Sequence, residues 1–252
     1  MKTTRWLVLG TLLSTAVGTT GAQVTLTRTD FALSEWEQVV LENSTGLGIS
    51  PSAPSSGGNI GSYLQLDVAS FETSGQQQRA VQAAYINSGL IYNPGTSGAI
   101  SSLNFGFDVR RFVGLSNGSG GSVAPLLRQG GEIFVFSGSL TNFSQNNWTP
   151  LGFDLAASNS WRTLSSAAVN PNFSVTGGVM EFGFRYSTGG LCSANVGQSC
   201  TSTQFQVGLD NYTVTITPAS TTVPEPSTVA LLAVGLAGIV TVSRRRRLTV
   251  TN

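Results

Sequence analysis

Carboxylates are the side chains of this 252-residue sequence that could carry out acid–base chemistry, because the chain contains no histidine. The absence of histidine excludes Ser-His-Asp and Cys-His catalysis and His-ligated zinc. Two facing carboxyl groups hydrolyse glycosides, and the candidates for such a pair are Glu35, Glu37, Glu132, Asp154 and Glu181. A carboxylate-dependent glycosidase or lyase is therefore the enzymatic alternative.

Spacing along the chain does not bring any two of these acids together. Glu181 lies four residues before Arg185 in an alternating segment, so both are expected on the outward face of one strand. A solvated ion pair explains this glutamate as well as catalysis does. Without a catalytic constellation, we expect a protein that is not an enzyme.

The two cysteines, Cys192 and Cys200, lie in a loop rich in glycine and serine. An even number of cysteines within one loop of an exported protein predicts a disulfide. Its loop is short, so the chain-entropy contribution to stability is about 2–3 kcal/mol at most. The spacing differs from the Cys-x-x-Cys of redox-active pairs.

Aromatic side chains suggest a binding function. Sugars stack their C–H faces on flat rings, and Trp148, Trp161 and Tyr92 each lie beside a polar turn from which a ring could project. They are the candidate glycan-binding residues. The alternative for each is that the ring covers the edge of the core.

The charges of the chain are few and unevenly placed. Between residues 23 and 222 there are seven arginines, no lysine and eleven acids, a net charge of about −4. Nucleic-acid binding depends on clustered lysine and arginine at the phosphates, so the body is not expected to bind nucleic acid.

Alternating segments separated by turn residues predict an all-β body. Residues 104–110 alternate with Phe105, Phe107 and Val109 on one face, and residues 179–186 and 212–217 alternate in the same way. Further strands are expected at residues 24–28, 63–68, 133–137 and 149–155. Residues 76–85 and the segment around Trp36 are the helix candidates. At this length, an antiparallel β-sandwich with jelly-roll-like topology is expected.

The last strand supports a closer comparison. Residues 207–214, with Asp210 and Asn211 before an alternating run, resemble the closing strand of jelly rolls of the carbohydrate-binding type. The resemblance implies that Asp210 helps hold a structural calcium or a loop. The other interpretation is that Asp210 and Asn211 bind backbone groups at a bend of the strand. No other cofactor is expected.

The N-terminal segment has the features of a secretory signal peptide. Lys2 and Arg5 precede an apolar run from Trp6 to Val17, and small residues follow up to Ala22. We therefore expect residues 1–22 to be removed, and residues 23–220 to form the exported domain.

Residues 221–252 have the organisation of a second targeting signal. Pro224, Glu225 and Pro226 precede an apolar stretch, which is followed by Arg244, Arg245, Arg246 and Arg247. From Ser227 to Ser243 a helix would be about 25 Å long, enough to cross a thin membrane. The arginines would remain cytoplasmic as a stop signal.

This order of tripeptide, apolar helix and arginine block resembles the PEP-CTERM sorting signal. The resemblance implies export in a Gram-negative bacterium that makes extracellular polysaccharide, with an exosortase as the partner that cuts near the tripeptide. We expect transient anchoring in the inner membrane with the body in the periplasm, followed by the cell surface or matrix. The leading hypothesis is a non-enzymatic surface or matrix protein; the alternative is a lectin-like module for extracellular polysaccharide.

Overall fold

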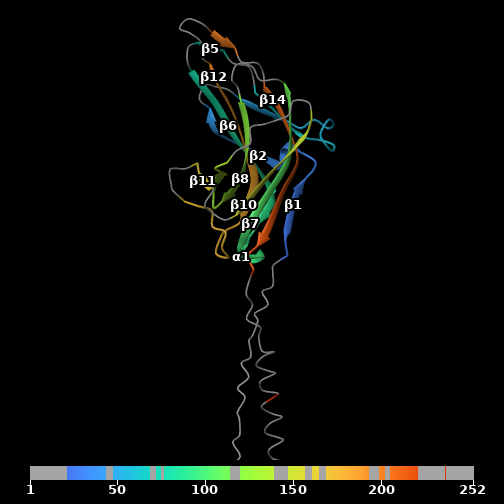
Figure 1. Cartoon of the computed structure of the whole chain (residues 1–252), viewed down its shortest axis with the longest axis vertical. Coiled ribbons are helices and arrows are strands. Elements are labelled where there is room, and N and C mark those ends of the chain that lie inside the picture. The colour runs from blue at the N-terminus through green and yellow to red at the C-terminus, as the bar shows by residue number, and fades with distance from the viewer. Residues whose placement is uncertain are drawn as a thin grey trace, which may run out of the picture. The chain divides into compact units, whose positions relative to one another are not determined.

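Antiparallel strands make up most of the computed structural model of this protein (Figure 1). The structure describes residues 22–43, 48–68, 72–74, 77–113, 120–138, 147–156, 161–164, 169–192, 199–201, 205–220 and 236. The body belongs to one compact unit, Ala22–Ala219. Met1–Gly21 and Ser220–Asn252 form the other unit, and of these only residues 220 and 236 are described.

Two six-stranded sheets form the body. The first, called the front sheet, has the order β10-β7-β14-β4-β3, with β1 also paired to β14. Its strands are β1 (Val24–Arg28), β3 (Ile49–Ser52), β4 (Leu64–Val68), β7 (Ile100–Val113), β10 (Thr149–Ala156) and β14 (Phe205–Pro218). The long strands β7 and β14 lie side by side in Figure 1.

The second, called the back sheet, has the order β11-β9-β8-β12-β6-β2. Its strands are β2 (Trp36–Asn43), β6 (Gln77–Tyr92), β8 (Gly120–Gln129), β9 (Glu132–Phe136), β11 (Trp161–Thr163) and β12 (Met180–Cys192). A small third sheet pairs β5 (Glu72–Ser74) with β13 (Ser199–Thr201), and two short helices are described, η1 (Leu33–Glu35) and α1 (Pro94–Ser97). The chain crosses repeatedly between the two large sheets, which confirms the predicted antiparallel, jelly-roll-like sandwich.

The core lies between the inner faces of the two sheets. The expected inward residues of three strands are buried, namely Phe105, Phe107 and Val109 in β7, Met180, Phe182, Phe184 and Tyr186 in β12, and Tyr212, Val214 and Ile216 in β14. Tyr212 also joins the sheets by a polar contact, because its hydroxyl donates to the Gly183 carbonyl at 2.7 Å. A buried hydrogen bond between layers fixes their relative position as well as adding to stability.

The two helix candidates are strands, so this expectation is wrong. Residues 77–92 form β6 and residues 36–43 form β2; only Leu33–Glu35 is helical near Trp36. β6 lies between β12 and β2 and is buried on both faces, as Ala83, Ala84 and Tyr85 show. A strand buried on both faces lacks the polar alternation that identifies a strand in a sequence.

A β-bulge in β14 sets which side chains face outward. Val207 and Leu209 point into the core at odd positions, whereas Tyr212 and Val214 point inward at even positions. The change of parity occurs where the register with β7 shifts between Asp210 and Thr213, and where Asn211 has a φ of 50°. Because of the extra residue, the odd-numbered side chains face the core before the bulge and the even-numbered side chains face it after the bulge.

The expected elements at the ends of the chain lie outside the described residues. These are the signal peptide, the tripeptide Pro224–Pro226, the transmembrane helix and the arginine block 244–247. Within the described part of the chain, no helix is long and apolar enough to cross a membrane. The membrane-spanning helix therefore stays a prediction.

Gly183 tests the packing of the back sheet. A Cβ at this position would overlap the carbonyl of Tyr85 in the neighbouring strand β6. Since β12 and β6 are paired along their length, neither strand can move away to make room for it. Gly183→Ala should lower the free energy of unfolding by about 3 kcal/mol, measured by urea denaturation. Gly152→Ala is the control, since a Cβ there meets nothing nearer than the Phe105 carbonyl at 3.8 Å. Equal stability of the two variants would contradict the tight approach of β12 to β6.

Candidate functional site

Three outward-facing residues of β14 organise the outer face of the front sheet. Gln206, Gly208 and Asp210 follow one another at every second position, so they lie on the same side of the strand. Their neighbours across the sheet are on β4 and β7. Each of the three meets a different part of the chain.

Asp210 holds the loop between β3 and β4. Its side chain is fully buried; Oδ2 accepts hydrogen bonds from the backbone N–H of Asn59 at 2.6 Å and of Ile60 at 3.1 Å. Oδ1 accepts from the N–H of Asn211 at 2.8 Å. Burial raises the pKa of the Asp210 carboxyl, and the three hydrogen bonds offset part of that rise. The carboxylate thus anchors two consecutive amides of a distant loop.

Asp108, the cross-strand partner of Asp210, binds the same loop. Its Oδ2 accepts from the side-chain amides of Asn59 and Asn211, each at 2.7 Å. The loop can approach this closely because Gly58 has no Cβ, which would lie 2.7 Å from Asp210 Oδ2, and Gly57 and Gly61 on either side adopt positive φ angles of 97° and 72°. The two aspartates and the glycines together give the loop one conformation.

These contacts combine the two roles considered for Asp210. Oδ2 anchors a loop, as the resemblance implied, and Oδ1 binds a backbone N–H at the bend of the strand, as the other interpretation had it. N–H donors occupy lone pairs that a calcium ion would need. The part of the chain that the structure describes contains no group of three or more acidic, histidine or cysteine side chains placed to hold a metal.

Gly208 forms the floor of an aromatic cluster made by Tyr63, Phe112 and Trp148. A Cβ at Gly208 would lie 2.7 Å from the Phe112 ring, 2.7 Å from Trp148 and 3.0 Å from Tyr63. The ring centroids are 5.3 Å apart for Tyr63–Phe112, 5.4 Å for Tyr63–Trp148 and 6.0 Å for Phe112–Trp148. Glycine is therefore the residue that lets three rings gather on the surface of a sheet.

The loop held by Asp210 also positions Trp148. The indole Nε1–H of Trp148 donates to the carbonyl of Gly57 at 3.3 Å. Trp148 and Phe112 are partly exposed, whereas Tyr63 is buried beneath them. The cluster thus presents part of an indole and part of a phenyl ring to solvent.

A chain of polar side chains borders the aromatic cluster. The Tyr63 hydroxyl donates to Gln65 Oε1 at 2.9 Å, and Gln65 Nε2 donates to Asp67 Oδ2 at 2.9 Å. Gln206 Nε2 donates to Asp67 Oδ1 at 2.6 Å. Burial raises the pKa of Tyr63, so its hydroxyl stays protonated at neutral pH. Amide and carboxylate groups therefore lie beside the rings in fixed positions.

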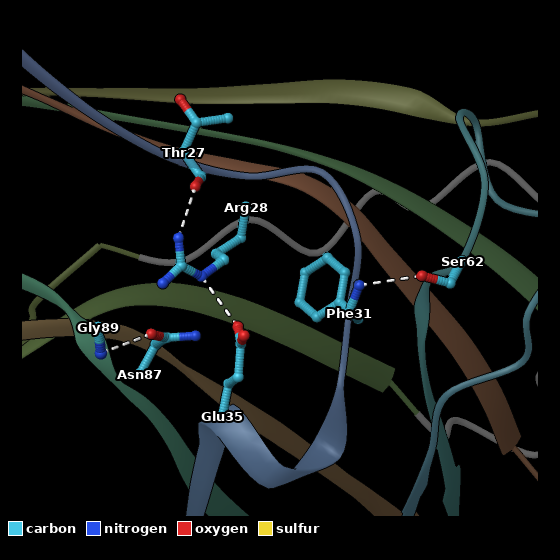
Figure 2. A network of polar contacts seen from close by, with 7 residues as sticks. All are labelled: Thr27, Arg28, Phe31, Glu35, Ser62, Asn87 and Gly89. Atoms are coloured by element: carbon cyan, nitrogen blue, oxygen red, sulfur yellow. Dashed lines mark hydrogen bonds and ion pairs between the residues drawn. The ribbon is translucent and has the colours of Figure 1, made fainter.

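A second network holds the other end of the loop (Figure 2). The N–H of Phe31 donates to the hydroxyl of Ser62 at 3.1 Å, next to the end of the loop. Arg28 lies nearby and donates from Nε to Glu35 at 3.0 Å and from one terminal nitrogen to the Thr27 carbonyl at 3.2 Å. The segment between β1 and β2 is thereby fastened to the loop beside the cluster.

Of the three aromatic residues predicted to bind glycans, Trp148 is the one in this cluster. Trp161 is 5% exposed and packs against Phe105 and Phe136 in the core. Tyr92 is 4% exposed, and its hydroxyl donates to the carbonyls of Ser97 and Gly98. The expectation that these two rings project from turns is corrected, because each begins or ends a strand of the back sheet and faces the core.

The structure brings two of the five acids considered for catalysis together, at Arg128, and leaves the other three elsewhere. Glu37 and Glu181 both bind Arg128, at 2.7 Å and 2.5 Å, so the cross-strand arginine and not Arg185 is the partner of Glu181. Glu35 pairs with Arg28, and Asp154 accepts a hydrogen bond from Asn104. Glu132 is exposed at the start of β9. Arg185 is buried and its nearest polar partner is Gln82 at 3.4 Å.

The predicted disulfide partners lie in strands of two different sheets. Cys192 ends β12 opposite Gln77, and Cys200 lies in β13 opposite Thr73. The side chains of both cysteines lie outside the described residues, so the disulfide stays a prediction.

Sequence reasoning missed Tyr63, Phe112 and Gly208 as members of the site. The available signal was a break in alternation: Arg110, Arg111 and Phe112 end a strand whose register with β14 shifts at this point. Which residues of a bulge face outward depends on the neighbouring strand, so the sequence alone does not assign them.

Residues 222–247 match the PEP-CTERM protein-sorting motif. None of the curated protein sequences matches the chain. This motif implies an exported protein that an exosortase sorts and that is anchored transiently in a membrane before processing.

Solved structures with a similar fold include carbohydrate-binding modules. One is a family 11 module from Clostridium thermocellum in complex with a β-1,3-1,4-mixed-linked tetrasaccharide, with a TM-score of 0.41 and 13% identity over 77% of this chain and 96% of that chain. Another is the CBM22-1 xylan-binding domain from Paenibacillus barcinonensis Xyn10C, with a TM-score of 0.36 and 9% identity over 82% of this chain and 99% of that chain.

Asp210 tests the anchoring of the loop. In Asp210→Asn, an amide nitrogen replaces one of the two accepting oxygens, so at least one backbone N–H at Asn59, Ile60 or Asn211 faces a donor. We expect a loss of about 2 kcal/mol in unfolding free energy and faster hydrogen exchange at the amides of residues 59 and 60. The exposed Asp154→Asn is the control, with a change within about 0.5 kcal/mol. Unchanged exchange at residues 59 and 60 would contradict the anchoring role.

Proposed function

We propose that this protein is a non-enzymatic component of the cell surface or extracellular matrix, and that its body binds extracellular polysaccharide through the aromatic cluster. The protein is first held in the inner membrane of a Gram-negative cell, with the body in the periplasm. An exosortase then removes the C-terminal segment. The sorting motif at residues 222–247 supports the first part, and the cluster at Gly208 supports the second.

The observation that carries the binding proposal is the position of Trp148. Its indole is partly exposed on the outer face of the front sheet, and its orientation is set by the ring contacts and by the bond to Gly57. A fixed ring can receive the C–H face of a sugar without a large loss of side-chain entropy. Gln65, Asp67 and Gln206 beside it offer the amide and carboxylate groups that bind sugar hydroxyls.

The environment of the acids supports a non-enzymatic role. Glycosidases use one protonated and one ionised carboxyl group on either side of the bond that breaks. Here Glu37 and Glu181 both bind the guanidinium of Arg128, which lies between the two carboxyl groups where a glycosidic bond would have to enter. Asp108 and Asp210 are engaged with the loop amides.

Processing by an exosortase is tested by the mass of the mature protein. Purified from cells with an active exosortase, the protein should lack the apolar stretch and residues 244–247, because cleavage near Pro224–Pro226 removes everything beyond it. Replacement of Glu225 by alanine should retain the full C-terminus. An intact C-terminus in the wild-type protein, read by mass spectrometry, would contradict the processing step.

Trp148 tests polysaccharide binding. Trp148→Ala should weaken retention on the polysaccharide of the producing cell by about 30-fold, since a central tryptophan contributes about 2 kcal/mol or more to a binding surface. Affinity electrophoresis or calorimetry measures the change, and Trp148→Phe should recover part of it. Leu33→Ala, at an exposed residue of η1, is the matched control and should bind as the wild type does.

Two results would count against this proposal. If the wild-type body does not bind the polysaccharide, the lectin-like role is contradicted. The matrix role is then supported only by the sorting motif at residues 222–247. Release of reducing ends from the polysaccharide by the wild type, lost in Glu37→Gln or Glu181→Gln, would support the glycosidase alternative instead.

A further inference from the structure

Arg110 is a cation at the aromatic cluster that forms no ion pair with any of the described residues. It lies in β7 directly opposite Gly208, on the outward face of the sheet, and its guanidinium carbon is 4.8 Å from the centroid of the Phe112 ring. The ion pairs among the described residues involve Arg28 and Arg128, and Arg110 is in none of them. The partly exposed rings of this site therefore have beside them an arginine that makes no ion pair within the described residues.

The nitrogen atoms of Arg110 differ in their access to a ligand. Nε is buried and has no hydrogen-bond partner. The two terminal nitrogens also make no hydrogen bond within the described residues but are not among the buried unpartnered atoms, so solvent reaches them. The stacking on Phe112 holds the guanidinium plane in place, which leaves its terminal N–H groups ready for a planar acceptor.

The acids on the same face of the sheet are engaged with other groups. Asp108 lies two residues before Arg110 in β7, opposite Asp210 of β14, and both accept hydrogen bonds from the loop and from Asn211. Asp67 accepts hydrogen bonds from Gln65 and Gln206 on its two oxygens. In the described part of the chain none of these three acids forms an ion pair with Arg110, so its terminal N–H groups are available to a carboxylate.

We infer that the cluster recognises an acidic polysaccharide, with a sugar ring stacked on Trp148 and a carboxylate of the same or the next residue bound by the terminal nitrogens of Arg110. A carboxylate matches the guanidinium in shape and charge and forms two parallel N–H···O bonds. This inference rests on the proposed glycan binding and specifies its ligand class, a uronic-acid polymer.

A nucleic acid, the other common polyanion, fits the site poorly. Phosphate recognition along a strand needs several basic residues in a row, and the body has seven arginines, no lysine and an excess of acids. Single-site contact with a carboxylate needs one arginine. At about 0.15 M salt, charges more than about 8 Å apart are largely screened, so the net negative body does not prevent such a contact.

Polygalacturonate and its fully methyl-esterified form are the probes that isolate the charge, because they share the same rings and differ in the carboxylate. Binding is measured by calorimetry at 0.15 M salt with a chelator present, using the mature body after export. The wild type should bind polygalacturonate at least tenfold more tightly than the ester, as expected for one charge-assisted contact. Arg110→Gln should reduce this preference to within about twofold.

Control variants separate charge recognition from stacking and from folding. Arg162→Gln changes an exposed arginine of β11, in the back sheet, and should keep the wild-type preference. Trp148→Ala should weaken the binding of both polymers. The thermal midpoint of Arg110→Gln is measured beside these, and Arg110→Lys, which keeps the charge without the planar fork, should retain part of the preference.

The outcomes distinguish this inference from the proposed function. Equal binding of both polymers by the wild type overturns the acidic ligand class and leaves glycan binding standing. If the wild type binds neither polymer but binds a neutral β-glucan, the acidic ligand class is likewise overturned and glycan binding still stands. If free galacturonate binds as tightly as the polymer, the site recognises a carboxylate and not a polysaccharide. If single-stranded DNA binds as tightly as the polymer, the site recognises polyanions in general. Either result overturns the inference.

Discussion

A single extra residue in β14 is the constraint on which the candidate site depends. With Asn211 in the left-handed region, the strand places Val207 and Leu209 in the core before the bulge and Tyr212 and Val214 in the core after it. Without that change of parity, one half of the strand would turn its apolar residues to solvent. The bulge lets the apolar residues before and after it both face the core. It also leaves Asp210 facing outward, where its carboxylate binds the loop.

The geometry of the aromatic cluster follows from this arrangement. Asp210 fixes the loop, the loop carbonyl of Gly57 receives the indole N–H of Trp148, and Gly208, two residues before Asp210, leaves room for the rings. Each contact joins segments far apart in the sequence. A rigid surface assembled in this way loses little entropy on binding, since its side chains are ordered before a ligand arrives.

The electrostatic character of the body is best understood locally. The two ends of the chain hold Lys2, Arg5 and the four terminal arginines, and the body between them is acidic. Within that acidic body the arginines have different surroundings: Arg128 bridges two glutamates, Arg185 is buried beside Gln82, and Arg110 stacks on Phe112 at the surface. Net charge therefore says little about what one cluster of side chains attracts.

Local alternation and contiguous motifs were enough to predict the all-β class, most strands, the inward residues of β7, β12 and β14, and the sorting motif from the sequence. The prediction failed for β6, because burial on both faces hides the alternation of a strand, and for β2, an edge strand most of whose residues are exposed. Only the tertiary structure decided that Trp161 and Tyr92 belong to the core while Trp148, Phe112 and Tyr63 meet above Gly208. Strand order and register make that choice, and both arise from contacts between residues distant in the sequence.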